Sequence, residues 1–242
     1  SEDEHLGLLG LLNSSIACVW MKQCAHNKGD STDNKGARTT GDVAFNTYAY
    51  NATLVGQFPL PPGRPLALAR QLDATAALLS AVSPAALLRG SSAEHSREAL
   101  ARRRSEWEAL RGVMIALQEE LDWECYRLYG LLGDDLTQRP KSAKDGGEKE
   151  NEENLCAFAP LREAFPIALG ERAFEIVLAR KIARGEVQST WFERHGSTPI
   201  TELPGDWPPA YRKLVERRIE AIESLPNIAL IEQPEYRSEE HT

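Results

Sequence analysis

One histidine lies in a segment that could support acid–base chemistry. His195 occurs in "WFERHGSTP", between the charged residues Glu193 and Arg194 and a Gly-Ser-Thr turn. An imidazole can act as a general acid or base near neutral pH, but it needs a nucleophile or a second titratable group within hydrogen-bonding distance. We find no Ser-His-Asp order, HExxH pattern or carboxylate–lysine cluster in the sequence. The favoured interpretation is a histidine that packs in a turn, and an enzyme built around His195 is a minor alternative.

A second segment, "DWPPAY" at 206–211, contains the residue types that hold a target amino group in amino-methyltransferases. Those enzymes use an uninterrupted Asp/Asn-Pro-Pro-aromatic tetrapeptide. Here Trp207 separates Asp206 from the first proline, and Ala210 separates the second proline from Tyr211. Prolines are common in the first turn of a helix, so the segment predicts a helix start and no catalytic site.

The remaining chemical motifs are weak or missing. The cysteines Cys18, Cys24, Cys125 and Cys156 lack the spacing of a disulfide framework, which favours reduced thiols in a cytoplasmic protein. Cys18, Cys24 and His26 suggest a metal site, but steps of six and eight residues bring ligands together poorly on a helix, so we expect no metal. Glycine-rich turns of the FxGxG, GxGxxG or GxxxxGK[ST] type do not occur. We therefore expect no cofactor bound by these residues alone.

Composition places the chain among ordinary soluble proteins. With 242 residues, of which 42% are hydrophobic, it can form one large domain or two small ones. A net charge of −8 argues against a compact nucleic-acid module, because such modules are usually basic. Any contact with DNA must come from a local patch.

The N-terminal segment "LGLLGLLNSSIACVWMKQ", at 6–23, is largely apolar. The acidic residues Glu2, Asp3 and Glu4 stand where a signal peptide has basic ones, and Asn13 and Lys22 interrupt a run too short to span a membrane. Its helical period predicts one buried helix that ends near Cys24.

The elements expected after this helix are mainly helical. A polar loop at 26–41 precedes one or two short strands at 42–58 and an amphipathic helix at 64–82. A longer helix at 94–130 carries a heptad-like seam that forms either a partner-binding coiled coil or an internal packing face. The seam residues are Leu100, Trp107, Leu110, Met114, Leu117, Leu121 and Leu128.

The C-terminal part continues this pattern. Residues 133–154 are almost without apolar side chains, which predicts a mobile loop, and helices are expected at 169–186 and 205–226. We predict an α+β, predominantly α fold, with a small β-rich module and long amphipathic helices. The expected regions are 1–90 (a helix, a polar loop and short strands), 91–132 (the long helix), 133–154 (a linker) and 155–242 (a helical region).

Several separate segments resemble one known family. They are "LGLLGLLNSSIACVWMKQ", "LQEELDWECYRLYGL", "LGERAFEIVLARKIARGE", "WFERHGSTPITELPGDWPPAYRKLVERRIEAIE" and "NIALIEQPEYR". Together they resemble the C-terminal part of the large adenine-specific DNA methyltransferases of BREX phage-defence systems, often called PglX, and more distantly the fused type II restriction-methylation enzymes. In that family the cofactor loop and the Asn-Pro-Pro-Tyr motif lie upstream of the "GLLNSS" helix. The resemblance implies that the chain begins at or just after the catalytic domain.

The resemblance also implies a role. The chain would be a non-catalytic target-recognition fragment of an enzyme that methylates a flipped adenine in double-stranded DNA with S-adenosylmethionine. Region 1–90 would contain the target-recognition module. Polar and aromatic side chains around 26–58, and an arginine cluster on the long helix, could contact phosphates and base edges. The candidate DNA-binding residues are Lys22, Lys28, Asn34, Lys35, Arg38, Asn46, Tyr48, Arg102 and Arg103. The alternative is a scaffold that holds other phage-defence proteins and reads no DNA.

Overall fold

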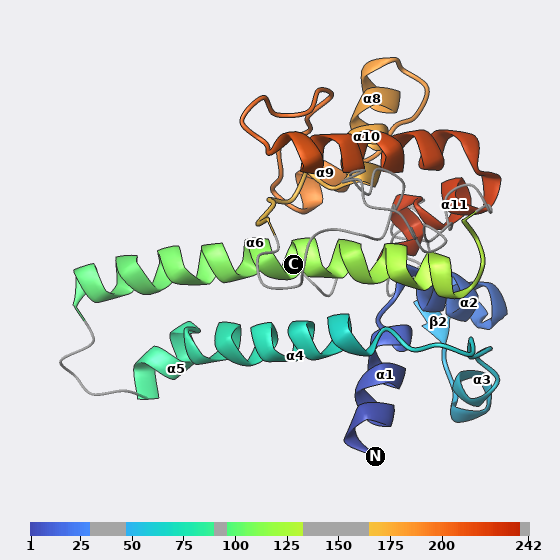
Figure 1. Cartoon of the computed structure of the whole chain (residues 1–242), viewed down its shortest axis with the longest axis horizontal. Coiled ribbons are helices and arrows are strands. Elements are labelled where there is room, and N and C mark those ends of the chain that lie inside the picture. The colour runs from blue at the N-terminus through green and yellow to red at the C-terminus, as the bar shows by residue number, and fades with distance from the viewer. Residues whose placement is uncertain (30–46, 90–95, 133–164, 238–242) are drawn as a thin grey trace, which may run out of the picture.

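A long helix, α6 (Arg97–Leu128), runs through the middle of the molecule, as the heptad-like pattern predicts. The structure is a computed structural model that describes residues 1–29, 47–89, 96–132 and 165–237. The N-terminal helices α1 and α4 lie on one side of α6 and the C-terminal helices α8 to α11 lie on the other (Figure 1). The predominantly helical fold is confirmed.

The other helices of the described chain are short to medium in length. Their bounds are α1 Glu2–Leu12, α2 Ser15–Cys24, α3 Ala52–Gly56, α4 Leu66–Ala81, α5 Pro84–Arg89, α8 Ala173–Ala183, α9 Trp191–Arg194, α10 Pro209–Ser224 and α11 Pro226–Ile231, followed by the 3₁₀ helix η3 Pro234–Tyr236. Within these described parts, no helix is long and apolar enough to cross a membrane.

The N-terminal segment forms two helices, so the prediction of one continuous helix is wrong. α1 ends at Leu12, and α2 starts after Ser14, whose side chain accepts a hydrogen bond from the backbone N–H of Ala17. A serine that caps the backbone in this way favours a new helix start over continuation. The predicted end near Cys24 is confirmed.

The expected β-rich module is not supported by the described residues. They contain one antiparallel pair, β1 (His26–Gly29) and β2 (Thr47–Ala49), with an irregularity in register between Asn27 and Gly29. Where a second strand was expected, Asn51 caps the short helix α3 by accepting from the N–H of Leu54 at 2.8 Å. An asparagine N-cap outweighs the strand preference of so short a segment.

The apolar seam of α6 is buried only along its second half. Leu117 and Leu121 are 4% and 0% exposed, whereas Leu100 is 50% exposed. α4 packs along α6, and the predicted helix at 64–82 is therefore confirmed as an intramolecular neighbour of the seam. In the second half of α6, the seam is therefore an internal packing face, which was one of the two alternatives.

Both C-terminal helices are confirmed. Gly185 follows α8 with a φ of +72°, as expected for a glycine helix stop, and α10 begins at Pro209. Pro226 starts the next helix, α11, as well as following α10. The predicted linker at 133–154 lies outside the described residues, so the proposed division into regions stays a prediction.

Gly170 is a position where a side chain should not fit. Its φ is +97°, and an added Cβ would lie 2.4 Å from the carbonyl oxygen of Thr198. Gly170→Ala is expected to lower the free energy of unfolding by about 2–4 kcal/mol, because backbone strain and overpacking add. Gly205→Ala, where a Cβ meets open space, is the control. Equal urea midpoints for the two variants would contradict this account.

Candidate functional site

A buried charged cluster joins the N-terminal helices to the C-terminal end of the described chain. Arg237 Nη1 donates to Asp122 Oδ2 at 2.7 Å and to Ser15 Oγ at 2.5 Å. Asp122 Oδ1 accepts from the backbone N–H of Ser15 at 2.7 Å. One carboxylate and one guanidinium thus fix the first residue of α2 against α6.

The same arginine also contacts α11 and α8. Its Nη2 lies 3.0 Å from Glu232 Oε2, and its guanidinium lies 4.4 Å from the ring centroid of Phe174. Tyr126 donates to Glu232 Oε1 at 2.7 Å. Burial raises the pKa of Glu232 to about 7, although Arg237 acts in the opposite direction. Burial works against the protonated form of Arg237, but Glu232 and Asp122 outweigh it and hold the arginine pKa above its ordinary value.

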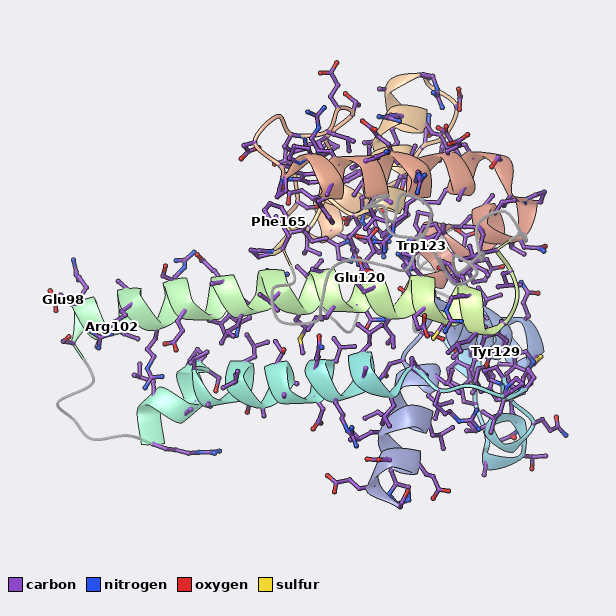
Figure 2. All side chains as sticks on the ribbon, in the orientation of Figure 1. Glu98, Arg102, Glu120, Trp123, Tyr129 and Phe165 are labelled. Atoms are coloured by element: carbon purple, nitrogen blue, oxygen red, sulfur yellow. The ribbon has the colours of Figure 1, made fainter. Side chains whose placement is uncertain are left out.

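A second buried arginine ties α10 to α6. Arg218 Nη2 donates to Glu120 Oε2 at 2.7 Å, and its guanidinium lies 5.2 Å from the ring centroid of Trp123. Glu120 and Trp123 both lie on the part of α6 that the C-terminal helices overlap (Figure 2). The neighbouring Glu119 accepts from the backbone N–H of Ala173, the first residue of α8, at 3.0 Å. Burial raises the pKa of Glu119.

These acidic and basic groups bind one another, so the cluster is suited to fixing helices in place. None of the sequence-based predictions includes this buried charged cluster. A signal was present, because Glu119, Asp122 and Tyr126 recur at helical spacing beside the apolar Leu121 and Cys125. Charged residues in a buried stripe require partners, and no rule of sequence spacing points to Arg237, 115 residues from Asp122.

Two of the predicted DNA-binding residues come together in what we term the α2–β2 edge, formed by Lys22, Gln23, Tyr48 and Tyr50. Lys22 Nζ lies 5.9 Å from the ring centroid of Tyr48 and donates to the carbonyl oxygen of Glu235. The rings of Tyr48 and Tyr50 are stacked with centroids 6.2 Å apart, and Tyr50 is 52% exposed. The edge therefore presents a cation, an aromatic pair and an amide on one surface.

The edge is held from both sides of α2. Gln23 Nε2 donates to the hydroxyl of Tyr236 at 2.6 Å, which connects α2 with η3. Beneath the edge, Trp20 packs against Phe58 at 5.5 Å between centroids, and Phe58 packs against Tyr129 at 6.3 Å. Because the Arg237 cluster fixes the start of α2, the position of this edge follows from buried contacts.

Arg102 and Arg103, the arginine candidates on α6, lie far from the α2–β2 edge. Arg102 is exposed, and Arg103 pairs with Glu106 at 3.8 Å. Arg102 and Tyr129 lie at opposite ends of α6 (Figure 2). At 1.5 Å per residue their separation is about 40 Å, so the arginines and the α2–β2 edge do not form one compact site.

Lys28 lies in β1. The candidates Asn34, Lys35, Arg38 and Asn46 lie outside the described residues.

His195 and the "DWPPAY" segment, which carry residue types found in catalytic sites, both pack within the fold. His195 Nδ1 lies 2.7 Å from the carbonyl oxygen of Trp191, and the two rings are 4.0 Å apart between centroids, which favours the turn-packing interpretation. In "DWPPAY", Trp207 and Tyr211 are buried against each other while Asp206 is exposed. The carboxylate and the two rings therefore do not converge on a shared site.

The thiols also have ordinary surroundings. Cys125 is buried, Cys24 is exposed, and burial raises the pKa of the half-buried Cys18. In the ranges that the structure covers, no group of three His, Cys, Asp or Glu residues is arranged to hold a metal ion.

Comparison with known proteins identifies the family. A family model described as a domain of unknown function, DUF7008, matches residues 114–239. The chain belongs to this family. The DUF7008 match starts within the second half of α6 and includes Glu119, Asp122, Arg218, Glu232 and Arg237. Ser15 lies outside the match, so its contacts with Asp122 and Arg237 join the DUF7008 region to the preceding helices.

One curated relative extends the comparison beyond the DUF7008 region. The chain is 44% identical over 238 residues to the adenine-specific methyltransferase PglX of Streptomyces coelicolor. This alignment covers 98% of the chain and 18% of PglX, so the chain spans less than a fifth of that relative's length. The resemblance to PglX proteins is confirmed. No solved structure matches the chain.

Proposed function

We propose that the chain is a non-catalytic DNA-recognition region of an S-adenosylmethionine-dependent adenine-specific DNA methyltransferase. The observation that carries the proposal is the 44% identity with PglX across nearly the whole chain. The sequence lacks glycine-rich cofactor loops, so we assign the cofactor and the methyl transfer to other parts of such an enzyme. In this proposal the whole protein acts in the cytoplasm, in phage defence or restriction-modification, on double-stranded DNA.

The α2–β2 edge is the surface that we assign to DNA. A lysine can neutralise a phosphate, an amide can bond base edges, and an exposed aromatic ring can contact sugars or bases. Lys22 already bonds to the carbonyl oxygen of Glu235 and to the side chain of Cys18, but an ammonium group has three donors and keeps one for a phosphate. The edge is local, which suits a chain with a net charge of −8.

Removing the polar and aromatic groups of the edge should weaken DNA binding. The variant Lys22→Gln, Gln23→Ala, Tyr50→Ala is expected to bind duplex DNA about tenfold or more weakly, with a salt slope smaller by about 1. Fluorescence anisotropy with a labelled duplex at low salt measures both quantities. Arg102→Gln, on the distant end of α6, is the matched control and should keep wild-type affinity.

Three results bear on the assignment. Wild-type binding by the triple variant, with weakened binding by Arg102→Gln, would move the DNA site to the arginines. Weakening by Lys28→Ala, Lys35→Ala, Arg38→Ala together would extend the site to the chain segment 28–38. Absence of DNA binding in any low-salt buffer would contradict DNA recognition by this chain.

One observation favours a second function, that of a protein-binding scaffold. Leu78 of α4 and Leu100 of α6 are 56% and 50% exposed. Exposed leucines on paired helices are suited to packing against another helix. A chain that binds no DNA but captures a purified phage-defence protein, with loss of capture in Leu78→Ser, Leu100→Ser, would support the scaffold.

A further inference from the structure

A pocket of about 450 Å³ opens between α6, the segment before α8 and the loop after α9. Its apolar walls include Ile115, Ile167 and Ile200, and its polar groups include Arg111, His195 and Ser197. Its volume falls within the range of small-molecule sites, which are typically apolar with a few convergent polar groups. Neither the proposed DNA contact at the α2–β2 edge nor the Arg237 cluster uses any of these residues.

Arg111 brings a cation into the pocket, and no carboxylate of the described residues pairs with it. Among the described residues it has no ion pair; its guanidinium lies 5.4 Å from the ring centroid of Trp107, and its buried Nε has no acceptor. A guanidinium stays protonated at any physiological pH, so its unmet donors favour a bound anion.

Two further groups can bind the same anion. Ser197 Oγ is buried and has no hydrogen-bond partner among the residues that the structure covers. His195 Nδ1 lies 2.7 Å from the carbonyl oxygen of Trp191, so Nδ1 donates there and Nε2 is the ring nitrogen that can contact a ligand.

The acidic residues at the pocket are already engaged. Glu171 Oε2 accepts from the backbone N–H of Ala168 at 2.7 Å, and Glu108 Oε1 accepts from Arg104 Nε at 2.8 Å. Within the described part of the chain, the Arg111 guanidinium is therefore a charged group of the pocket that has no ion pair.

We propose that this pocket binds a small phosphate ester, with its phosphate on Arg111, Ser197 and His195 and its organic part against the isoleucine walls. The planar donor fork of arginine matches the tetrahedral oxygens of phosphate, and the Ser197 hydroxyl supplies a further donor. The ester could be a free nucleotide or the terminal phosphate of a DNA strand, since both present the same group.

Calorimetric titration of the full chain with AMP, adenosine and inorganic phosphate tests the proposal. AMP is expected to bind saturably and at least about tenfold more tightly than adenosine, because adenosine lacks the charged group. Arg111→Gln should weaken AMP binding at least about tenfold, and Ser197→Ala should weaken it about threefold. Arg102→Gln, an exposed arginine on the same helix, should leave it unchanged.

A comparison of two duplexes distinguishes a free nucleotide from a strand end as the source of the phosphate. We compare the affinity for a duplex with a 5′-terminal phosphate with the affinity for the same duplex without it. Preference for the phosphorylated duplex, lost in Arg111→Gln, identifies a strand end; binding of AMP without that preference identifies a free nucleotide. Equal affinity for AMP and adenosine, wild-type affinity in a folded Arg111→Gln variant, or no saturable binding up to about 10 mM would overturn the proposal. This test is independent of the proposed DNA site, because the substitutions at the α2–β2 edge change no residue that lines this pocket.

Discussion

Replacing Arg237 with alanine is expected to lower the free energy of unfolding by about 3–5 kcal/mol, because it leaves the carboxylates of Asp122 and Glu232 buried without their cation. The loss should exceed that of an ordinary surface ion pair several-fold. Arg184→Ala is the matched control, since Arg184 pairs with Glu186 at about half exposure and should cost about 1 kcal/mol or less. Urea denaturation followed by circular dichroism measures both variants.

A combined variant separates charge burial from lost packing. If the unpaired carboxylates cause the loss, then Arg237→Met together with Asp122→Asn and Glu232→Gln should recover part of the stability lost in Arg237→Ala. A loss below about 1 kcal/mol in Arg237→Ala would show that the cluster does not hold α2 and the C-terminal segment in place.

Glu175→Gln is expected to have an effect of similar size, about 3–5 kcal/mol. The Glu175 carboxylate accepts hydrogen bonds from the backbone N–H groups of Gly170 and Arg172, from two guanidinium nitrogens of Arg172 and from Nε1 of Trp191, at 2.8–3.1 Å. An amide cannot neutralise the buried guanidinium, and it offers one oxygen to these five donors. Glu171→Gln is the control, because within the described residues the Glu171 carboxylate accepts from a single backbone N–H, that of Ala168.

The pH dependence of stability gives an independent signature of Glu175. Burial acts to raise its pKa, but Arg172 and the hydrogen bonds outweigh burial and lower the pKa below 4.5. The folded state therefore binds this proton less readily than the unfolded state, so the stabilisation is present above pH 4.5 and is lost as pH falls through the folded-state pKa. Glu175→Gln should remove this part of the acid dependence, and an unchanged slope would contradict the assignment.

Helical period predicted the elements that bury one clear apolar face. Phe174 and Val177 of α8, and Leu214 and Ile219 of α10, are buried as expected. Local capping chemistry was harder to anticipate, because Ser14 divides one apolar run into two helices and Asn51 replaces an expected strand with a helix. Such outcomes depend on single hydrogen bonds within a few residues.

The buried charges could not be assigned from the sequence for a different reason. The partners of Asp122 and Arg218 come from distant segments of the chain, and no local pattern in the sequence identifies those partners. Of the candidate DNA-binding residues, Lys22 and Tyr48 were selected by residue type and by the family resemblance, and their proximity follows from the pairing of β1 with β2 beside α2.

Hydrogen exchange of the chain with and without duplex DNA is the measurement that tests DNA recognition at the α2–β2 edge most directly. The account predicts slower exchange on DNA binding in peptides covering 18–29 and 47–57, which include Lys22, Gln23, Tyr48 and Tyr50. It predicts little change in peptides covering 97–111, where Arg102 and Arg103 lie. Protection confined to 97–111, or no protection under conditions where the DNA is bound, would contradict it.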